Sequence, residues 1–370
     1  MDSFAFIIHP IDAKRDVSRK FPLLGRILTE RQIDFFSTFF PPVYLSEIEG
    51  IVSAATEKCI KGWFIACPYT PRRMMELPVS TVYHKIVQTG HMAESLGANI
   101  LGLGAYTSVV GDAGLTIARA LDIPVTTGDA FTVAIAVQAM AAAAQAMEIP
   151  LSNACTAVVG ATGAIGRVCA ELLAGQVGSL LLVGRDPGKL GQLKERLEPG
   201  AAAAIRTSTS MDSLASAELI LTVTSALHDV IHPEYLRPGS VVCDVARPRD
   251  VSAMVAAARD DILVIDGGMV DVPGSVDFHF NFGFPPAKAY ACMAETMVLA
   301  LEGRFEDYTV GKEIALERVN EIAALARKHG FHLSGFRSFE REVTSQQIEI
   351  VRRNAGKQRS RSSSGTAAGA

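Results

Sequence analysis

The sequence lacks three patterns that would assign it to a common class of protein. Its six cysteines form no Cys-x-x-Cys pair and no cluster with histidine at zinc spacing, so we expect reduced thiols and no metal site. Its 35 Lys and Arg residues form no long stripe interleaved with aromatics and the net charge is −4, which argues against nucleic acid as a ligand. The first residues lack the basic region and apolar stretch of a secretory signal. We therefore expect a cytoplasmic protein.

Long uncharged segments are also scarce. The exception is residues 130–147, which carry no charge over 18 positions, close to the shortest length of a membrane span. Nine of these residues are alanine, which forms helices well but is only weakly hydrophobic. We predict a buried helix that links two domains, with no transmembrane segment. A peripheral membrane contact stays open, although no amphipathic anchor is evident.

The chain does contain enough apolar sequence for two cores, because 49% of its 370 residues are hydrophobic. Up to about residue 126, short apolar runs mix with turn signals. From about 154, five apolar runs alternate with helical stretches, as in a parallel sheet covered on both faces. We predict an α/β fold with two domains, one of them built on a parallel sheet.

A glycine-rich turn opens the second part of the chain. The segment "TAVVGATGAIGRVCAELLAG" runs from a predicted strand into a predicted helix, with glycines at 160, 163 and 166. This is the context of a dinucleotide-binding turn, in which a pyrophosphate lies on free amides at the start of the helix. The candidate cofactor-binding residues of this turn are Gly160, Thr162, Gly163, Ala164, Ile165 and Gly166. The spacing G-x-x-G-x-x-G is a variant of the usual motif, so a Rossmann-like domain without nucleotide stays an alternative.

The loops after two later strands indicate which dinucleotide binds. Arg185 follows the second strand, where an acidic residue would receive the ribose of NAD, and a guanidinium there suits the 2′-phosphate of NADPH. Asp186 comes next and keeps NADH open. Thr224 and Ser225 follow the fourth strand, so we expect them near the nicotinamide end. We predict an NADP-binding Rossmann domain with NADPH as the cofactor.

The domain boundaries follow from these patterns. We predict a substrate domain over residues 1–150, which includes the linking helix 130–147, and the Rossmann domain over 151–275. Helices in residues 276–345 should pack back on the substrate domain. Residues 346–370 are basic and lack apolar periodicity, which predicts a disordered tail.

One cysteine in the predicted C-terminal helices is a candidate nucleophile. Pro285 and Pro286 fit a helix start, which would place Cys292 in about the second turn. Lys288 would lie on the same face and lower the pKa of the thiol, whereas Glu295 would raise it. Free cysteine is also a common buried residue. The local sequence leaves core packing and nucleophile both open.

The chain as a whole resembles the long-chain acyl-[acyl-carrier-protein] reductases of cyanobacterial type. The resemblance covers roughly residues 4–335 and depends on "IIHPIDAKRDVSRKF", "LGAYTSVV", "TTGDAFTVAIAVQAMAAAA", "AVVGATGAIG", "VIDGG", "ACMAETMVLALEG" and "ARKHGF". It implies an NADPH-dependent reduction of a fatty acyl thioester to an aldehyde through an acyl group bound to Cys292. The first domain would then hold the acyl chain, and the family's glycine turn and arginine map onto Gly160, Gly163, Gly166 and Arg185. Lys288 is a second candidate catalytic residue only because of its spacing from Cys292.

The resemblance also implies partners and leaves some groups unassigned. The acyl donor would be acyl carrier protein or a coenzyme A thioester, and an aldehyde-consuming enzyme is a possible partner. The segment "TTGDAFT" departs from the family pattern, because Asp129 and Phe131 stand where the family tends to have Asn and His. Candidate donors to an oxyanion are the "TVTSA" loop and "YTS" at 106–108.

Two other functions remain open from the sequence. A dehydrogenase of the shikimate or amino-acid type would share the architecture and reduce a small substrate directly, but it would need a Lys/Asp proton-relay pair in the first domain, and no obvious pair stands out. A non-catalytic NADPH-sensing or scaffold protein would keep the fold without the chemistry.

Overall fold

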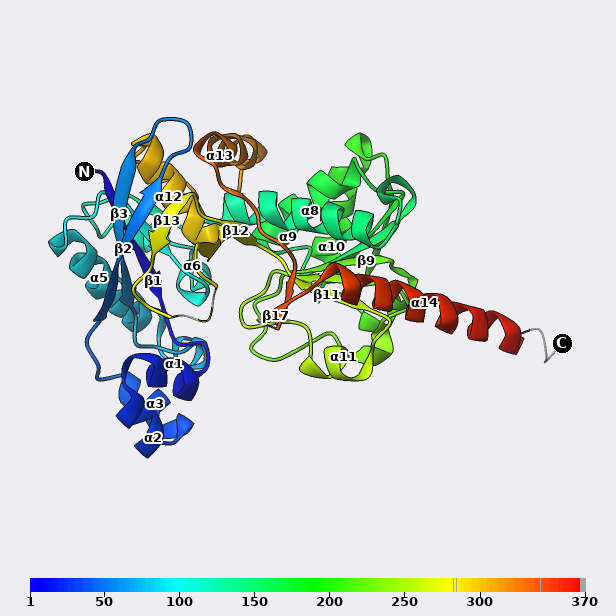
Figure 1. Ribbon diagram of the computed structural model, residues 1–370, viewed down its shortest axis with the longest axis horizontal. Helices are drawn as coiled ribbons and strands as arrows, with labels where there is room; N and C mark the ends of the chain where they lie inside the picture. Colours follow the sequence, from blue (N-terminus) through cyan, green and yellow to red (C-terminus); the bar gives the residue numbers. More distant parts are fainter. Residues whose placement is uncertain (282, 284, 340, 367–370) are drawn as a thin grey trace. The chain divides into compact units, whose positions relative to one another are not determined.

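The computed structural model describes residues 1–281, 283, 285–339 and 341–366 (Figure 1). The chain divides into two compact units. Unit 1 comprises Met1–Thr132 and Met269–Ser334, and unit 2 comprises Val133–Gly268 and the chain from Gly335 on. Unit 2 is thus inserted between two parts of unit 1. The boundary lies within the linking helix, so most of that helix belongs to unit 2 and not to the predicted first domain.

Unit 1 is built on a mixed sheet of six strands. The strands are β1 (Ser3–Ile8), β2 (Val43–Val52), β3 (Cys59–Ala66), β4 (Leu101–Leu103), β5 (Val125–Thr126) and β13 (Gly274–Asp277). Their order is β13-β2-β3-β1-β4-β5, with β3, β1, β4 and β5 parallel and β2 and β13 antiparallel to their neighbours. The central strand β1 is apolar at nearly every position because both of its faces are covered.

Helices cover both faces of this sheet. They are α1 (Ala13–Lys20), α2 (Pro22–Ile27), α3 (Glu30–Ser37), α4 (Pro71–Glu76), α5 (Val79–Ser95), α6 (Tyr106–Val109), α7 (Leu115–Ala118), α12 (Ala291–Glu302) and α13 (Leu316–His329). Ile7 of β1 lies in one buried cluster with Ile86 of α5. The other face of the sheet meets α12, where a Cβ at Gly102 would lie 2.2 Å from Oγ1 of Thr296 and 2.4 Å from the Phe6 ring. Helices α5 and α12 therefore lie on opposite faces of the sheet, as Figure 1 shows.

A second, three-stranded antiparallel sheet completes unit 1. It consists of β14 (Lys288–Tyr290), β12 (Met269–Asp271) and β15 (His332–Leu333), in that order. It joins the segment that returns from unit 2 to the segment that leads into α12. This sheet fixes where α12 begins.

Unit 2 has a parallel sheet with the strand order of a dinucleotide-binding fold. The strands are β6 (Cys155–Val159), β7 (Ser179–Val183), β8 (Ala204–Ser208), β9 (Leu219–Thr222), β10 (Val241–Asp244) and β11 (Leu263–Asp266). Their order β11-β10-β9-β6-β7-β8 is that of a dinucleotide-binding sheet, whose two halves meet where β6 pairs with β9. The predicted α/β class with a parallel Rossmann sheet is confirmed, and the five apolar runs all form strands. The sequence missed β8, an edge strand with exposed polar positions.

The helices of unit 2 include the uncharged segment. They are α8 (Asp129–Ala146), α9 (Ala164–Ala174), α10 (Pro187–Leu197), α11 (Ala253–Ala258) and α14 (Ser345–Thr366), with short 3-10 turns η1 (Leu151–Asn153), η2 (Glu198–Gly200), η3 (Met211–Ser216) and η4 (Pro233–Tyr235). Helix α8 is long and apolar enough to cross a membrane by length and composition, with a mean hydropathy of 1.3. However, 67% of it is buried inside the structure, as expected of the predicted core helix.

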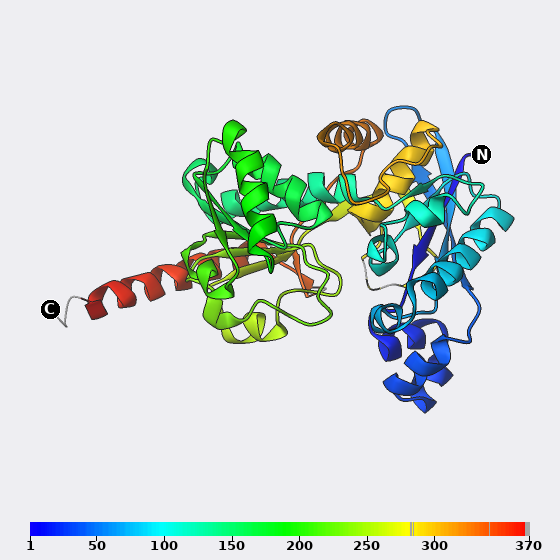
Figure 2. The same ribbon diagram turned by 180° about the vertical axis from the view of Figure 1, so that it is seen from behind.

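The C-terminal segment differs from the predicted disorder. After a short hairpin, β16 (Arg337–Ser338) and β17 (Arg341–Glu342), the residues Ser345–Thr366 form α14 (Figures 1 and 2). Ile348 and Ala355 are buried against unit 2, and Nε of Arg359 donates to the Pro238 carbonyl at 3.2 Å. Two apolar positions seven residues apart anchor this polar helix, which is too sparse a pattern to stand out in the sequence. Residues 367–370 of the predicted tail lie outside the described residues.

Candidate active site

Cys292 is the second residue of α12 and is half-buried. The sequence prediction that the helix begins at Pro285 is wrong, because residues 288–290 pair with β12 as strand β14 and the helix starts only at Ala291. The thiol therefore lies in the first turn, closer to the helix N-terminus than expected. There the helix dipole and the backbone amides favour a negative charge.

Gly128 brings the turn between β5 and α8 against this cysteine. Its φ is +77°, a conformation that favours glycine. A Cβ added there would lie 2.3 Å from Cα and 2.5 Å from Cβ of Cys292. The segment "TTGDAFT", which the sequence marked as a departure from the family pattern, is therefore packed on the candidate nucleophile.

Asp129 follows Gly128 and is the first residue of α8. Asp129 is only 5% exposed. Burial, and then the nearby charge of Glu295, raise the pKa of Asp129 to about 7, against an ordinary value of 3.8. Asp129 is thus a buried carboxyl group that can change its protonation near neutral pH.

Glu295 lies one helical turn beyond Cys292 and has a different environment. It is fully buried and accepts hydrogen bonds from Oγ1 of Thr126 at 2.5 Å, Oγ1 of Thr309 at 2.8 Å and the amide of Phe131 at 2.8 Å. Burial raises the pKa of Glu295, and these donors oppose the rise. Glu295 therefore holds α12 to the β5–α8 turn and to the Thr309 segment.

The surroundings of Cys292 keep its thiol protonated at rest. Burial, and then the charges of Asp129 and Glu295, raise its pKa to about 12, whereas the amides of Met293 and Cys292 itself lower it. The predicted effect of Glu295 is confirmed. A nucleophilic thiolate at this position therefore requires that the proton be taken up by a neighbouring group.

Lys288 does not lie on a helix with Cys292. It belongs to β14, where its Nζ lies 2.5 Å from Oδ1 of Asp271 and donates to Oγ of Ser334 at 2.6 Å. We predict from the sequence that Lys288 lies one helical turn before Cys292 and lowers the pKa of its thiol. This prediction is wrong, because Lys288 lies in strand β14 and α12 begins only at Ala291. The ion pair ties β14 to β12 and to the residue after β15.

Two of the hydroxyl groups proposed for the oxyanion, those of Thr107 and Ser108, bond to the backbone. Oγ1 of Thr107 donates to the Gly104 carbonyl at 2.8 Å, and Oγ of Ser108 donates to the Ala105 carbonyl at 2.6 Å. The amide of Tyr106 donates to Nε2 of His9 at 2.9 Å, and burial lowers the pKa of that histidine to about 4. Thr107 and Ser108 thus use their hydroxyl groups to hold a short helical turn.

In unit 2, the glycine turn has the geometry of a dinucleotide site. Gly160 has φ +82°, and a Cβ there would lie 2.4 Å from the Val223 carbonyl. A Cβ at Gly166 would lie 2.2 Å from the Gly160 carbonyl, so both positions require glycine for packing. Gly163, by contrast, has only one such neighbour, at 3.3 Å, and is exposed at the start of α9.

This turn leaves helix amides available to a ligand. Gly163 is the N-cap residue of α9, and no side chain within the described part of the chain caps the helix. Thr162, Ala164 and Ile165 are partly accessible around it. An uncapped helix N-terminus beside an exposed glycine suits a pyrophosphate. The residues present therefore fit the predicted cofactor turn.

Two residues after β7 have separate tasks. Arg185 is exposed at the end of the strand. The side chain of Asp186 caps α10 by accepting from the amides of Gly188 at 2.9 Å and Lys189 at 3.1 Å. Asp186 is therefore occupied by the helix, and Arg185 is the more accessible of the two for an adenosine phosphate.

The loop after β9 is held by a buried carboxylate. Asp250 accepts from Oγ1 of Thr222 at 2.6 Å, from the amide of Thr224 at 2.8 Å and from the Thr224 hydroxyl. The Thr224 side chain therefore shapes the loop, and Ser225 is exposed on it. The sequence did not indicate Asp250, which lies 28 positions from Thr222.

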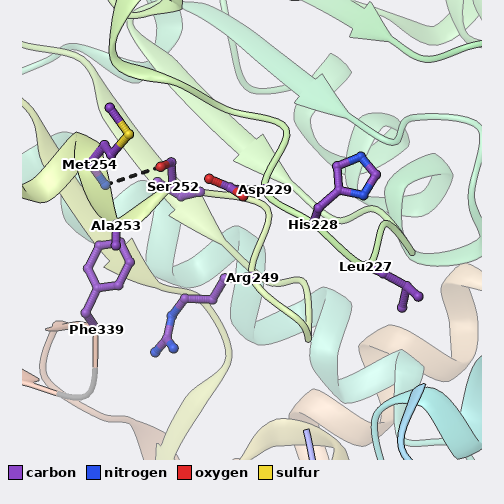
Figure 3. A pocket seen from close by; sticks show the side chains of 9 residues that line it. Leu227, His228, Asp229, Arg249, Ser252, Ala253, Met254 and Phe339 are labelled. Carbon is purple, nitrogen blue, oxygen red and sulfur yellow. Dashed lines mark hydrogen bonds between the residues drawn. The ribbon is translucent and has the colours of Figure 1, made fainter. Parts of the chain in front are cut away.

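An open pocket of about 510 Å³ lies beside this loop within unit 2. Figure 3 shows Arg249 and Phe339 on one side, with Asp229 directed toward Ser252. The guanidinium of Arg249 lies 5.3 Å from the Phe339 ring and pairs with Asp266 at 3.0 Å. The pocket follows β9 and β10, and ligands of such sheets bind beyond the carboxyl ends of strands.

A dinucleotide-type sheet, a fitting glycine turn and a separate unit with a half-buried thiol define an oxidoreductase-type protein with an NAD(P)-binding Rossmann fold. The profile of the shikimate/quinate 5-dehydrogenase family matches residues 141–266, which lie within unit 2. This similarity supports an enzyme of the dehydrogenase or reductase type.

Two characterised proteins and one solved structure are similar to longer parts of the chain. The chain is 32% identical to the aminotransferase PigE of Serratia sp. (strain ATCC 39006) over 95% of its length, but it spans only 42% of the length of that protein. It is 29% identical to the long-chain acyl-[acyl-carrier-protein] reductase of Synechococcus elongatus, over 87% of this chain and 95% of that one. The L-tryptophan dehydrogenase from Nostoc punctiforme aligns over 96% of this chain and 88% of its own, with 13% identity and a TM-score of 0.42.

Proposed function

We propose that this protein reduces a long-chain fatty acyl thioester to a fatty aldehyde, with NADPH as the reductant and Cys292 as the nucleophile. Acyl carrier protein or coenzyme A would deliver the acyl group. The observation that carries the proposal is the position of Cys292, a half-buried thiol in the first turn of α12 beside the buried carboxyl group of Asp129. The similarity to an acyl-[acyl-carrier-protein] reductase over 87% of the chain supports it.

The first step requires a base, because the resting thiol is protonated. We assign this role to Asp129, whose charge raises the pKa of the thiol. Transfer of the proton from Cys292 to Asp129 leaves the number of negative charges in the cluster unchanged, so the two groups titrate as a coupled pair. The thiolate that forms meets the first amides of α12.

Acyl transfer to Cys292 and reduction of the bound acyl group then follow. The thiolate of Cys292 attacks the acyl carbon, the carrier thiolate leaves, and the proton on Asp129 returns to it. One thioester replaces another, so this exchange has little thermodynamic cost. NADPH, when bound, would supply the hydride to the acyl carbon. Collapse of the resulting thiohemiacetal oxyanion would then release the aldehyde and return Cys292 as a thiolate, which takes up a proton from water.

The two acids of the cluster have different roles in this scheme. Glu295 is saturated with donors and holds the turn in place. Asp129 has no ion-pair partner in the described part of the chain and changes its protonation near neutral pH. Different environments of neighbouring carboxyl groups commonly mark such a division between a fixed charge and a proton carrier.

The choice of NADPH depends on Arg185. Its guanidinium can form charge-assisted hydrogen bonds to a 2′-phosphate, whereas the neighbouring Asp186 is occupied as the cap of α10. Gly163, Ala164 and Ile165 would hold the pyrophosphate through backbone amides.

A direct dehydrogenase acting on a small substrate is the second candidate. Unit 1 does contain a Lys/Asp pair, Lys288 with Asp271, which the sequence did not reveal. The shikimate/quinate dehydrogenase profile matches residues 141–266, so it includes neither this pair nor the thiol cluster. The similarity to an acyl-[acyl-carrier-protein] reductase over 87% of the chain is what favours acyl transfer.

Acyl labelling distinguishes the candidates. The protein is incubated with palmitoyl-acyl carrier protein or palmitoyl-coenzyme A, without NADPH, and analysed by mass spectrometry. We expect a hydroxylamine-sensitive acyl adduct on Cys292 that NADPH discharges as aldehyde. The matched control is Cys59→Ala, because Cys59 is a free, exposed thiol. Absence of the adduct in both the native protein and the control would reject acyl transfer.

A further inference from the structure

Helices α2 and α3 expose an unusual set of large apolar side chains. Leu23 and Ile27 of α2 are 72% and 73% exposed, and Phe39 just after α3 is 72% exposed. We call the following set the aromatic patch: Phe21, Leu23, Ile27, Phe35, Phe36 and Phe39. Soluble proteins bury most large apolar side chains, and a concentration of exposed ones marks an interaction surface.

The rings of this patch contact one another at the surface. The Phe35 ring lies 5.4 Å from that of Phe36 and 5.8 Å from that of Phe39, both edge to face. Leu23 and Ile27 are one helical turn apart and so share a face of α2. Both helices pack against α1, and Figures 1 and 2 show the three helices together at one end of unit 1. The patch therefore comes from two short helices that both pack against α1.

Basic residues accompany the patch. Residues 13–44 carry six Lys or Arg and three Asp or Glu, although the whole chain has a net charge of −4. Lys14, Arg15, Arg26 and Arg31 are exposed on the same three helices. Exposed phenylalanine and leucine beside lysine and arginine are typical of helices that lie in the interface of an anionic membrane.

We propose that α1–α3 bind the surface of an anionic lipid bilayer, with the aromatic patch inserted at the headgroup level and the basic side chains on the lipid phosphates. Local positive charge in an acidic protein gives complementarity to such a surface. An interface between two copies of the chain would also use exposed aromatic residues and arginine, so self-association is the contradicting outcome of the test below. The proposal does not depend on acyl reduction.

The sequence shows no evident amphipathic anchor, and the way the proposed surface is built gives a physical reason for this. A single long helix would show a continuous apolar periodicity. Here the apolar residues are divided between the short helices α2 and α3 and the residues that flank them. No single stretch of the sequence therefore shows the apolar periodicity of an amphipathic helix. Only the packing on α1 brings the helices together.

Vesicle flotation of the full chain tests the proposal. The assay compares vesicles of phosphatidylcholine that contain about 30% phosphatidylglycerol with vesicles of pure phosphatidylcholine. We expect the chain to bind the anionic vesicles, and to bind the pure phosphatidylcholine vesicles at least about tenfold more weakly. The double variant Phe35→Ser/Phe39→Ser should lose at least tenfold in binding, and Arg26→Glu/Arg31→Glu should lose the preference for phosphatidylglycerol. Met254→Ser is the matched control, because Met254 is 63% exposed in unit 2.

Thermal unfolding verifies that the variants remain folded. Equal flotation of the native chain and the Phe35→Ser/Phe39→Ser variant would overturn the proposal. It would also be overturned if the chain ignored vesicles but formed concentration-dependent oligomers that the same variant abolished, because the patch would then be a contact between copies.

Discussion

In unit 2 the pyrophosphate-binding part of the candidate site is one continuous segment, Gly160–Gly166, whose backbone amides would bind the ligand. In unit 1 the candidate site takes Gly128 and Asp129 from one turn, Cys292 and Glu295 from a distant helix, and Thr309 from a third segment. A site made of backbone depends on local spacing, whereas a site made of side chains depends on tertiary packing. The two sites should therefore respond differently to substitution.

The replacement Asp129→Asn should have the largest effect and should be confined to unit 1. Without the base, acylation of Cys292 by the acyl donor should slow by about 10²–10⁴-fold. Alkylation of the same thiol by iodoacetamide should become faster at a given pH, because the Asp129 charge no longer raises the thiol pKa. Mass spectrometry follows both reactions. A parallel fall in both rates would mean that Asp129 only supports the fold.

The pH dependence gives a second readout of Asp129. Acylation by the native protein should increase with pH through about 7, as Asp129 ionises, and the variant should lack this step. The raised pKa also means that the folded state binds this proton more tightly than the unfolded state. The stabilising contribution is thus complete below pH 4 and decreases as the pH rises toward 7. Asp244 of unit 2, whose pKa burial also raises to about 7, is the control: Asp244→Asn should alter stability but not thiol alkylation.

The replacement Gly128→Ala should break the unit 1 site by sterics alone. The new Cβ would overlap the Cys292 backbone, so the turn or α12 must shift. A displacement of this order can cost about 100-fold in rate. The matched change is Gly163→Ala, whose Cβ meets only the Gly160 carbonyl, at 3.3 Å. It should weaken NADPH binding and leave acylation without NADPH intact. Acylation of Cys292 without NADPH and turnover with NADPH are measured for both variants. Loss of acylation in Gly163→Ala would contradict the view that the two sites respond separately to substitution.

The same contrast explains what the sequence predicted. The strands of unit 2 and the glycine turn before α9 could be predicted from the sequence, because each depends on neighbouring residues. The role of Arg185 stays a prediction. The role of Lys288 was wrong because strand pairing with β12 decides where α12 begins. Glu295 was identified as a charge near Cys292, but its three donors come from Thr126, Phe131 and Thr309, which only the fold brings together.

The replacement Arg185→Ala should have a moderate effect that is confined to one cofactor. A hydrogen bond to a charged group contributes about 1.5–3 kcal/mol, so the KM for NADPH should rise by roughly tenfold or more. The KM for NADH should hardly change, because the 2′-phosphate is the only group that NADH lacks. Steady-state kinetics with both cofactors measure the ratio. An equal loss with NADH would show that Arg185 supports the fold and does not select the cofactor.

The replacement Lys288→Met should have the smallest effect. The Lys288–Asp271 pair is partly exposed, with side-chain exposures of 27% and 48%, so solvent screens it and its loss should cost about 0–1 kcal/mol of unfolding free energy. Lys288 ties β14 to β12, and β14 leads directly into α12. Acylation of Cys292 should therefore decrease only slightly, because the start of α12 is held less firmly. Chemical denaturation and acyl labelling measure the two effects. If Lys288→Met instead abolished turnover while Cys292→Ala retained it, the Lys/Asp pair would be the proton relay of a direct dehydrogenase, and the thiol would be core packing.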